Sequence, residues 1–325
     1  MGARIVGTGR HVPEQTLTNA DLEHIVDTSD EWIVQRTGIK MRHLLRDEEL
    51  PSEMSVVAGA RAIEAAGLRP TNVDLLLVAT TFPDMICPGS APFVADGLGI
   101  GNAPFFDLKA GCTGFVYGLA IADGLIRAGL WRRILLIGAE ALSRVTDWTD
   151  RQTCVLFGDG AGAILLEPGG EEEGVLGSAL YGDAEKALLL HMPAGGTRAP
   201  ASAATIDGGD HFLKMEGSGV FRNAAPMMEK ATLGALRAAD LALSDVDWII
   251  PHQANVRIID ALIRRLEVEP ERVISNLDRV ANTSAASIPI ALDEALRDGT
   301  IRPGDVVAVT GFGAGVTYGA VIVRI

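Results

Sequence analysis

The stretch Phe105-Phe106-Asp107-Leu108-Lys109-Ala110-Gly111-Cys112-Thr113-Gly114-Phe115 reads as a strand, a tight turn of small residues and the start of a helix. This order is the building unit of an α/β fold. Cys112 is predicted at the helix N-terminus, where unpaired backbone N–H groups and the positive end of the helix dipole favour a thiolate. The small neighbours leave room for a substrate to approach. A buried cysteine that only begins a helix is the alternative, because free cysteines are often buried.

Similar segments lie on both sides of this stretch and predict an α/β fold with two duplicated halves, residues 1–170 and 171–325. An acidic, glycine-rich linker over 167–174 would join the halves. Chance alternation, which any α/β protein shows, is the alternative. The apolar strand runs and helical patterns are 74–80, 114–128, 133–138 and 161–166 in the first half, and 246–250, 285–296, 305–309 and 318–323 in the second.

Composition narrows the class of protein. Hydrophobic residues make up 48% of 325 residues, and no apolar run approaches the length of a membrane span. The first ten residues lack the pattern of a signal peptide, so we expect a soluble, cytoplasmic protein without membrane association. Three cysteines form neither an even disulfide framework nor a zinc-site spacing, so no metal is expected. A net charge of −14 argues against nucleic-acid binding, and an acidic partner protein would need a local basic patch.

Three further segments carry polar groups at places suited to a site. His252 follows a predicted strand, at the end where open α/β folds usually build their sites, although it could be a simple loop residue. Asn282 opens a polar cluster before a predicted helix, where N-capping is the plainer reading. Residues 310–315 form a glycine-rich turn between two predicted strands, which could be an ordinary hairpin or could aim backbone N–H groups at an oxyanion.

Together these segments resemble the β-ketoacyl-[acyl-carrier-protein] synthase III family, which has a thiolase-like fold. The resemblance implies a layered αβαβα core made of the two halves, and a homodimer. It covers nearly the whole chain in the right order. Besides the segments above, the matching stretches are residues 18–22, 27–34, 36–39, 157–163, 193–196 and 282–287.

The resemblance implies that Cys112, His252 and Asn282 act together, with no cofactor beyond the acyl-CoA and malonyl-carrier substrates. Cys112 would take the acyl group, while its own N–H and that of Ala314 hold the oxyanion. His252 and Asn282 would stabilise the enolate formed when the malonyl thioester loses CO₂. The carbanion would attack the acyl-cysteine and give a β-ketoacyl product that starts a fatty acid. A Cys/His/Asn set marks the chain-initiating branch, and the lack of a second cysteine in the C-terminal turn disfavours a thiolase.

The resemblance also assigns residues around this centre. Trp32 and Arg151 are suited to sandwich adenine and Arg36 to meet a phosphate, although a helix anchor and surface ion pairs are the plainer readings. The CoA-binding set as a whole is Thr28, Trp32, Arg36, Arg151, Phe221, Ala224 and Asn255. The acyl pocket is assigned to Cys87, which would come from the partner subunit, and to Leu142, Phe157, Leu190, Leu213 and Met215. An acyl carrier protein would dock on Arg222, Arg257, Arg264 and Arg265, unless these only form a solvated surface.

Two alternatives to fatty-acid initiation stay open. A related enzyme of secondary metabolism could condense other substrates or transfer acyl groups to nitrogen or oxygen. A non-catalytic partner subunit would usually lose the nucleophile, so the retained Cys112, His252 and Asn282 count against it. Lys109, where the family usually has a small residue, has no functional explanation from the sequence.

Overall fold

Two sheets form the centre of the molecule, and four strands of the first have counterparts in the same order in the second. A computed structural model describes residues 2–170 and 173–325. The five-stranded sheet has the order β1 (Ala3–His11), β7 (Asp159–Pro168), β6 (Ile134–Ala141), β4 (Leu75–Ala79), β5 (Phe105–Leu108). The four-stranded sheet has the order β8 (Gly174–Gly182), β13 (Thr317–Arg324), β12 (Val306–Gly313), β11 (Trp248–Pro251).

Strand directions match between the two sheets. In the first, β7 lies antiparallel to β1 and β6, and β4 lies parallel to β6 and β5. In the second, β13 lies antiparallel to β8 and β12, and β11 lies parallel to β12. The predicted strand runs are therefore confirmed, as is the predicted α/β class. The glycine-rich turn is shorter than predicted, because ladder bonds to β13 extend β12 through Gly313.

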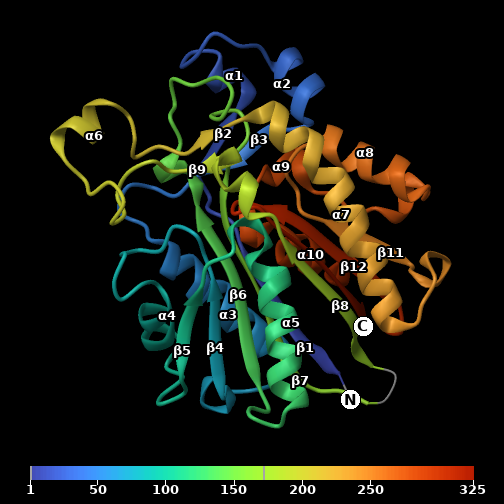
Figure 1. Ribbon diagram of the computed structural model, residues 1–325. Coiled ribbons are helices and arrows are strands. Elements are labelled where there is room, and N and C mark those ends of the chain that lie inside the picture. The colour runs from blue at the N-terminus through green and yellow to red at the C-terminus, as the bar shows by residue number, and fades with distance from the viewer. Residues whose placement is uncertain (1, 171–172) are drawn as a thin grey trace.

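The helices form three layers, one between the two sheets and one on the outer face of each sheet (Figure 1). Two helices with apolar faces on both sides lie between the sheets, and a single core cluster joins them to strands of both sheets. Two helices cover the outer face of the first sheet and two cover that of the second. The middle layer contains α5 (Gly114–Arg127) and α10 (Ser287–Arg297). The outer layer on the first sheet contains α3 (Pro51–Ala65) and α4 (Ala91–Leu98), and the outer layer on the second sheet contains α7 (Gly217–Ala239) and α8 (Val256–Leu266).

Packing on both faces explains the apolar strand runs. Every residue of β4 is buried, as expected for a parallel strand covered by helices on both sides. Each buried Leu or Phe side chain in such a core contributes about 1.5–3 kcal/mol to folding. The sheets and the two middle helices therefore give a rigid base for the segments at the strand ends.

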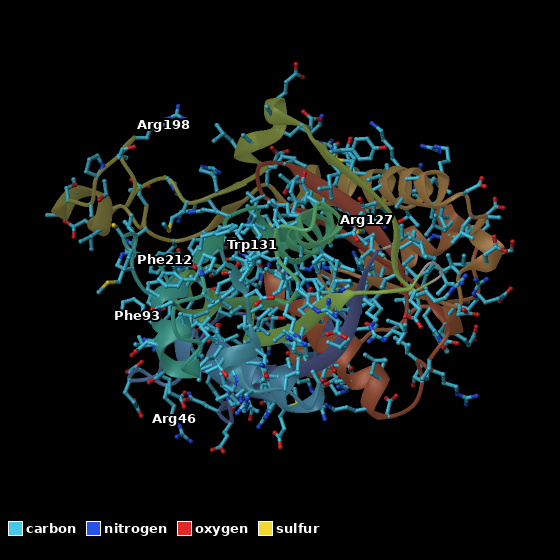
Figure 2. All side chains as sticks on the ribbon, turned by 90° about the horizontal axis from the view of Figure 1, so that it is seen from below. Arg46, Phe93, Arg127, Trp131, Arg198 and Phe212 are labelled. Carbon is cyan, nitrogen blue, oxygen red and sulfur yellow. The ribbon has the colours of Figure 1, made fainter. Side chains whose placement is uncertain are left out.

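Short elements cover one end of the two sheets (Figure 1). The segment that carries α6 extends away from the body, and Figure 2 shows Arg198 on its outer side. No helix within the described part of the chain is long and apolar enough to span a bilayer. The short elements are β2 (Thr16–Thr18), α1 (Asn19–Leu22), α2 (Asp30–Thr37), β3 (Met41–His43), β9 (Leu190–His191), α6 (Ala203–Asp207), β10 (Lys214–Met215) and α9 (Leu277–Val280).

The predicted linker, residues 167–174, overlaps the last two residues of β7 and the first residue of β8. Within it, Glu171 and Glu172 lie outside the described residues. The division of the chain into halves at residues 170 and 171 therefore stays a prediction.

Candidate active site

Cys112 lies in a tight turn that packs against the glycine-rich turn of the other half. It belongs to the 3-10 turn η2 (Gly111–Thr113), which leads directly into α5. A Cβ on Gly313 would lie 2.6 Å from the Cys112 nitrogen, and one on Gly111 would lie 2.8 Å from the Ala314 nitrogen. Only glycine permits this approach, and Gly111 also has a positive φ of 57°. The N–H groups of Cys112 and Ala314 therefore both lie where the two turns meet, which is a placement suited to an oxyanion site.

His252 follows β11 and is buried. Its Nδ1 lies 2.7 Å from the Oγ of Ser287, which also accepts the backbone N–H of Gln253 at 3.4 Å. The Ser287 hydroxyl is therefore free to donate to Nδ1, which leaves the hydrogen of the neutral ring on Nε2. Burial lowers the pKa of His252 to about 4, so the ring is neutral at pH 7. The structure thus makes Nε2–H a hydrogen-bond donor.

Asn282 is fixed by its own backbone and by a neighbour. Its N–H donates to Leu156 O, its C=O accepts from Gly158 N, and both bonds are 3.0 Å long. The side-chain Oδ1 accepts the backbone N–H of Ser284 at 2.9 Å. This bond assigns the orientation of the amide and leaves its NH₂ group available as a donor.

One cavity of about 610 Å³ brings the predicted set together. Cys112, His252 and Asn282 all line it, although they come from three segments far apart in the sequence. The cavity therefore holds a thiol, an N–H donor from an imidazole and an N–H donor from an amide.

The charge state predicted for Cys112 is opposed by its environment. The pKa of the thiol is raised to about 11, chiefly by burial and to a lesser extent by the nearby Glu140 carboxylate. The hydrogen bond from Ser284 Oγ, 3.3 Å from Sγ, lowers the pKa but offsets only part of this effect. Cys112 does lie at the start of a helix, as predicted, but desolvation raises the pKa of its thiol by more than the helix dipole lowers it. Cys112 is a neutral thiol at pH 7 until another group takes its proton.

At the mouth of the cavity, two cations lie over one aromatic ring. Both Arg36 and Arg151 place their guanidinium carbon 4.8 Å from the centre of the Trp32 ring. Arg151 also donates to Asp27 O at 3.0 Å. Arg151 therefore occupies the ring face where adenine was predicted. Of the remaining residues assigned to CoA, Phe221, Ala224 and Asn255 line the cavity. Thr28 is not among the lining residues, and its Oγ1 is buried without a partner in the described part of the chain.

Three residues of the predicted acyl pocket line the cavity, namely Phe157, Leu190 and Met215. Leu142 and Leu213 lie behind them in the same apolar cluster. Cys87 is exposed in this single chain and does not line the cavity. Its predicted place in the pocket depends on a second subunit.

The four arginines predicted to dock a carrier protein are all exposed on α7 and α8. Arg257 also lines the cavity mouth. Arg265 pairs with Glu229 at 2.6 Å and Arg222 with Glu216 at 3.8 Å, while Arg257 and Arg264 make no ion pair with a described residue. Lys109 is also exposed and makes no ion pair with a described residue.

Three residues of the site were missed from the sequence. Ser287 and Ser284 fell within the polar cluster around Asn282, where N-capping explained them equally well. Glu140 is fully buried and its carboxylate accepts from Ser284 at 3.1 Å. A charged residue within the otherwise apolar run of β6 was the signal that could have revealed it.

Comparison with known proteins identifies the family. Residues 106–184 match 3-Oxoacyl-[acyl-carrier-protein (ACP)] synthase III, and residues 236–325 match its C-terminal part. The chain is 50% identical to a Beta-ketoacyl-[acyl-carrier-protein] synthase III of Desulfitobacterium hafniense over 98% of this chain and 97% of that one. A crystal structure of 3-oxoacyl-[acyl-carrier-protein] synthase III from Aquifex aeolicus VF5 is 41% identical, with a TM-score of 0.92 and 100% of both chains covered.

A priming β-ketosynthase from the R1128 polyketide pathway is also similar, at 34% identity and a TM-score of 0.92 over 100% of this chain and 96% of that one. The family resemblance and the thiolase-like fold predicted from the sequence are thus confirmed. The chain belongs to the 3-oxoacyl-[acyl-carrier-protein] synthase III family, and it is an acyltransferase of the condensing-enzyme type.

Proposed function

We propose that this enzyme uses Cys112 to carry the acyl group from acyl-CoA and then condenses that group with malonyl-acyl-carrier protein in the cytoplasm. The observation that carries the proposal is the meeting of one thiol and two N–H donors in a single cavity. A thiolate is the nucleophile that acylation needs, and N–H donors are what an enolate oxygen needs. Membership of the family supports the same reaction.

In the first half-reaction, the Cys112 sulfur attacks the thioester carbonyl. The N–H groups of Cys112 and Ala314 stabilise the oxyanion, because their turns pack backbone to backbone. CoA then leaves and the acyl group stays on Sγ. Trp32, Arg36 and Arg151 hold the nucleotide end of CoA at the mouth. Because Arg151 now covers one face of the Trp32 ring, its guanidinium moves aside when adenine binds there.

In the second half-reaction, the malonyl thioester oxygen lies between His252 Nε2–H and the Asn282 amide. Loss of CO₂ places negative charge on this oxygen, and the two donors stabilise it. The carbanion attacks the acyl carbonyl, the bond from carbon to Sγ breaks, and the β-ketoacyl group remains on the carrier. A neutral His252 suits this step because the imidazole donates without protonating the carbanion.

The malonyl carrier docks on the exposed arginines of α7 and α8. Arg257 and Arg264 make no ion pair with a described residue, so their positive charge is available to a partner on a chain of net charge −14. Such a patch attracts an acidic carrier and orients it at the cavity mouth.

The enzyme works as a homodimer that pairs along β5. This strand is at the edge of its sheet, and Phe105 and Phe106 on it are 42% and 43% exposed. Figure 2 shows Phe93 of the adjacent α4 at the outer edge of the molecule, and this side chain is also exposed. Open edge strands with large apolar side chains are prone to pair with another chain. Cys87 lies on the loop beside this edge and would reach the partner's cavity.

A role in secondary metabolism is the second candidate, and the likeness to the R1128 priming enzyme favours it. The higher identity to the Desulfitobacterium enzyme favours fatty-acid initiation.

The test is a condensation assay with malonyl-acyl-carrier protein and acetyl-, butyryl-, isobutyryl- and octanoyl-CoA, with Cys112→Ser as the control. Carrier-bound β-ketoacyl product that depends on Cys112 is the expected result. Acyl-Cys112 that forms without any condensation would point instead to an acyltransferase of secondary metabolism. Failure of acylation would overturn both candidates.

A further inference from the structure

Glu140 is a buried carboxylate that the proposed reaction steps do not use. It lies on β6 with none of its surface exposed. Its Oε1 accepts the backbone N–H of Thr81 at 2.9 Å, and its Oε2 accepts that of Phe82 at 3.3 Å. A buried carboxylate without a cationic partner is costly to a fold, so its position beside a nucleophile calls for a function.

Ser284 joins this carboxylate to the nucleophile. Its Oγ lies 3.1 Å from Glu140 Oε1 and 3.3 Å from Cys112 Sγ. Ser284 has a positive φ of 50°, which costs a residue other than glycine about 1–2 kcal/mol. The N–H bond to Asn282 Oδ1 holds it in this conformation. The backbone is thus strained at the residue whose hydroxyl lies between a thiol and a carboxylate.

The hydroxyl has one hydrogen and can donate it to only one neighbour. When Ser284 donates to a charged Glu140, a lone pair of its Oγ is free to accept the S–H of Cys112. This arrangement carries a proton from sulfur to carboxylate. His252, which lines the cavity, carries its hydrogen on Nε2 and therefore cannot accept there.

We propose that Glu140, acting through Ser284, accepts the proton of Cys112 when the acyl group is loaded. The S–H bond breaks, its electron pair stays on sulfur, the proton passes to Ser284 Oγ, and the proton of Ser284 passes to Glu140 Oε1. The thiolate attacks the thioester, and the CoA thiolate that leaves takes a proton from water. After condensation releases Cys112 as a thiolate, Glu140 returns its proton through Ser284. The inference rests on the proposed role of Cys112. Ser284, which touches the reacting sulfur, is a catalytic residue, and Glu140 is a positioning residue that acts through it.

The groups around Glu140 support this exchange. Burial raises the pKa of Glu140 to about 7, which suits an acceptor that must also return the proton. Two further carboxylates, Asp84 and Asp159, have hydrogen-bond donors of their own. Asp84, on the loop after β4, binds Ser52 N at 3.2 Å, and Asp159 on β7 binds Ser143 and Leu45. His252, from the end of β11, is neutral, so Cys112 is the titratable group that the described hydrogen bonds connect to Glu140.

A purely electrostatic role for Glu140 predicts the opposite result in a mutant. The negative charge of Glu140 raises the pKa of the thiol, so its removal alone would make Cys112 more reactive near pH 7. A relay predicts a less reactive cysteine, because the acceptor is lost. The two roles are therefore distinguishable by thiol reactivity, without any acyl-CoA.

The experiment compares wild type, Glu140→Gln and Ser284→Ala. Alkylation of Cys112 by iodoacetamide is followed from pH 5.5 to 10 by mass spectrometry of the peptide that contains Cys112, which excludes labelling of Cys87 and Cys154. In wild type we expect the rate to rise near pH 7 as Glu140 loses its proton. In both variants this rise is lost, and the rate at pH 7.5 falls about tenfold or more, since only the intrinsic ionisation of the thiol remains.

Asp159→Asn is the matched control, because Asp159 is also a buried carboxylate with a raised pKa. It should leave the pH profile of Cys112 unchanged. A wild-type profile without a rise near pH 7, or a Glu140→Gln profile that keeps it, overturns the proposal. If Glu140→Gln does not fold, Ser284→Ala is judged by the same criteria. Condensation activity is scored separately, so that loss of the relay and failure of the proposed function give different results.

Discussion

The side-chain oxygen of Asn282 accepts the backbone N–H of Ser284 at 2.9 Å, and this bond decides which end of the amide is free. The same residue is held through its backbone by Leu156 and Gly158. Asn282 is therefore fixed at three points, and its NH₂ group is the donor left for a substrate. The position of one donor in the cavity is therefore set by backbone bonds between segments more than 120 residues apart in the sequence, Leu156–Gly158 and Asn282.

Asn282→Asp should separate the two half-reactions. Aspartate keeps an oxygen for the N–H of Ser284 but has no N–H to donate to an enolate. We expect decarboxylation of malonyl-carrier protein to fall about 10²–10³-fold, as for the loss of an oxyanion donor. Acylation of Cys112 by acetyl-CoA should change only a few-fold. Product formation and mass detection of acyl-Cys112 measure the two steps, and an equal loss in both would contradict the prediction.

Ser287→Ala should allow the imidazole of His252 to adopt both neutral tautomers. Without the hydroxyl at 2.7 Å, nothing holds the hydrogen on Nε2. Loss of one hydrogen bond of about 0.5–1.5 kcal/mol predicts a decarboxylation rate roughly 2–10-fold lower. Nitrogen NMR of the imidazole should show a mixture of both tautomers. Ser55→Ala on α3 removes another buried serine, which bonds Pro51 O, and should alter neither measurement.

Much of this fold can be predicted from apolar runs and turn residues, because these patterns reflect the conformations of residues close together in the sequence. The apolar run 74–80 became the buried strand β4, and the turn around Cys112 became the start of α5. His252 and Asn282 could be placed in the site only through the family resemblance. Residue spacing does not show which strand ends meet.

The contacts of the nucleophile could not be predicted, because they depend on packing between distant segments. Ser284 is 172 residues from Cys112 and 144 residues from Glu140. The sequence showed a helix start at Cys112 and therefore a favoured thiolate. Burial, which raises the pKa of the thiol, is a property of the whole fold.

Acid should destabilise the protein partly through His252. Burial lowers the pKa of this imidazole to about 4, whereas in the unfolded chain it is about 6.5. Between these values the unfolded state binds a proton that the native state does not, so stability is lost as the pH falls from 6.5 toward 4. The contribution is at most about 1.4 kcal/mol per pH unit. Urea unfolding at pH 7.5, 6 and 5 should give a smaller loss in His252→Asn than in wild type, and equal losses would rule this out.

Trp32→Ala should weaken the binding of acyl-CoA without slowing its reaction. The ring lies at the mouth and contacts two guanidinium groups, not the reacting sulfur. Loss of its stacking and cation–π contacts, about 1–2 kcal/mol, predicts a KM for acetyl-CoA roughly 5–30-fold higher and a kcat within twofold. Trp131→Ala removes a tryptophan just before β6, at the far end of that strand, and should leave KM unchanged. A fall in kcat with an unchanged KM would place Trp32 in the chemistry instead.

Cys87→Phe should restrict the enzyme to short primers. Cys87 is exposed in one chain and lies beside the open edge of β5, so in the proposed dimer it reaches the cavity of the partner. A phenylalanine there fills space that a longer acyl chain needs. Pocket fit of this kind changes kcat/KM by about 10–200-fold, so octanoyl- and isobutyryl-CoA should lose at least tenfold relative to acetyl-CoA. Cys87→Ala, which leaves the space open, should keep the wild-type ranking, and unchanged relative rates across the primer series for Cys87→Phe would refute the placement of this residue.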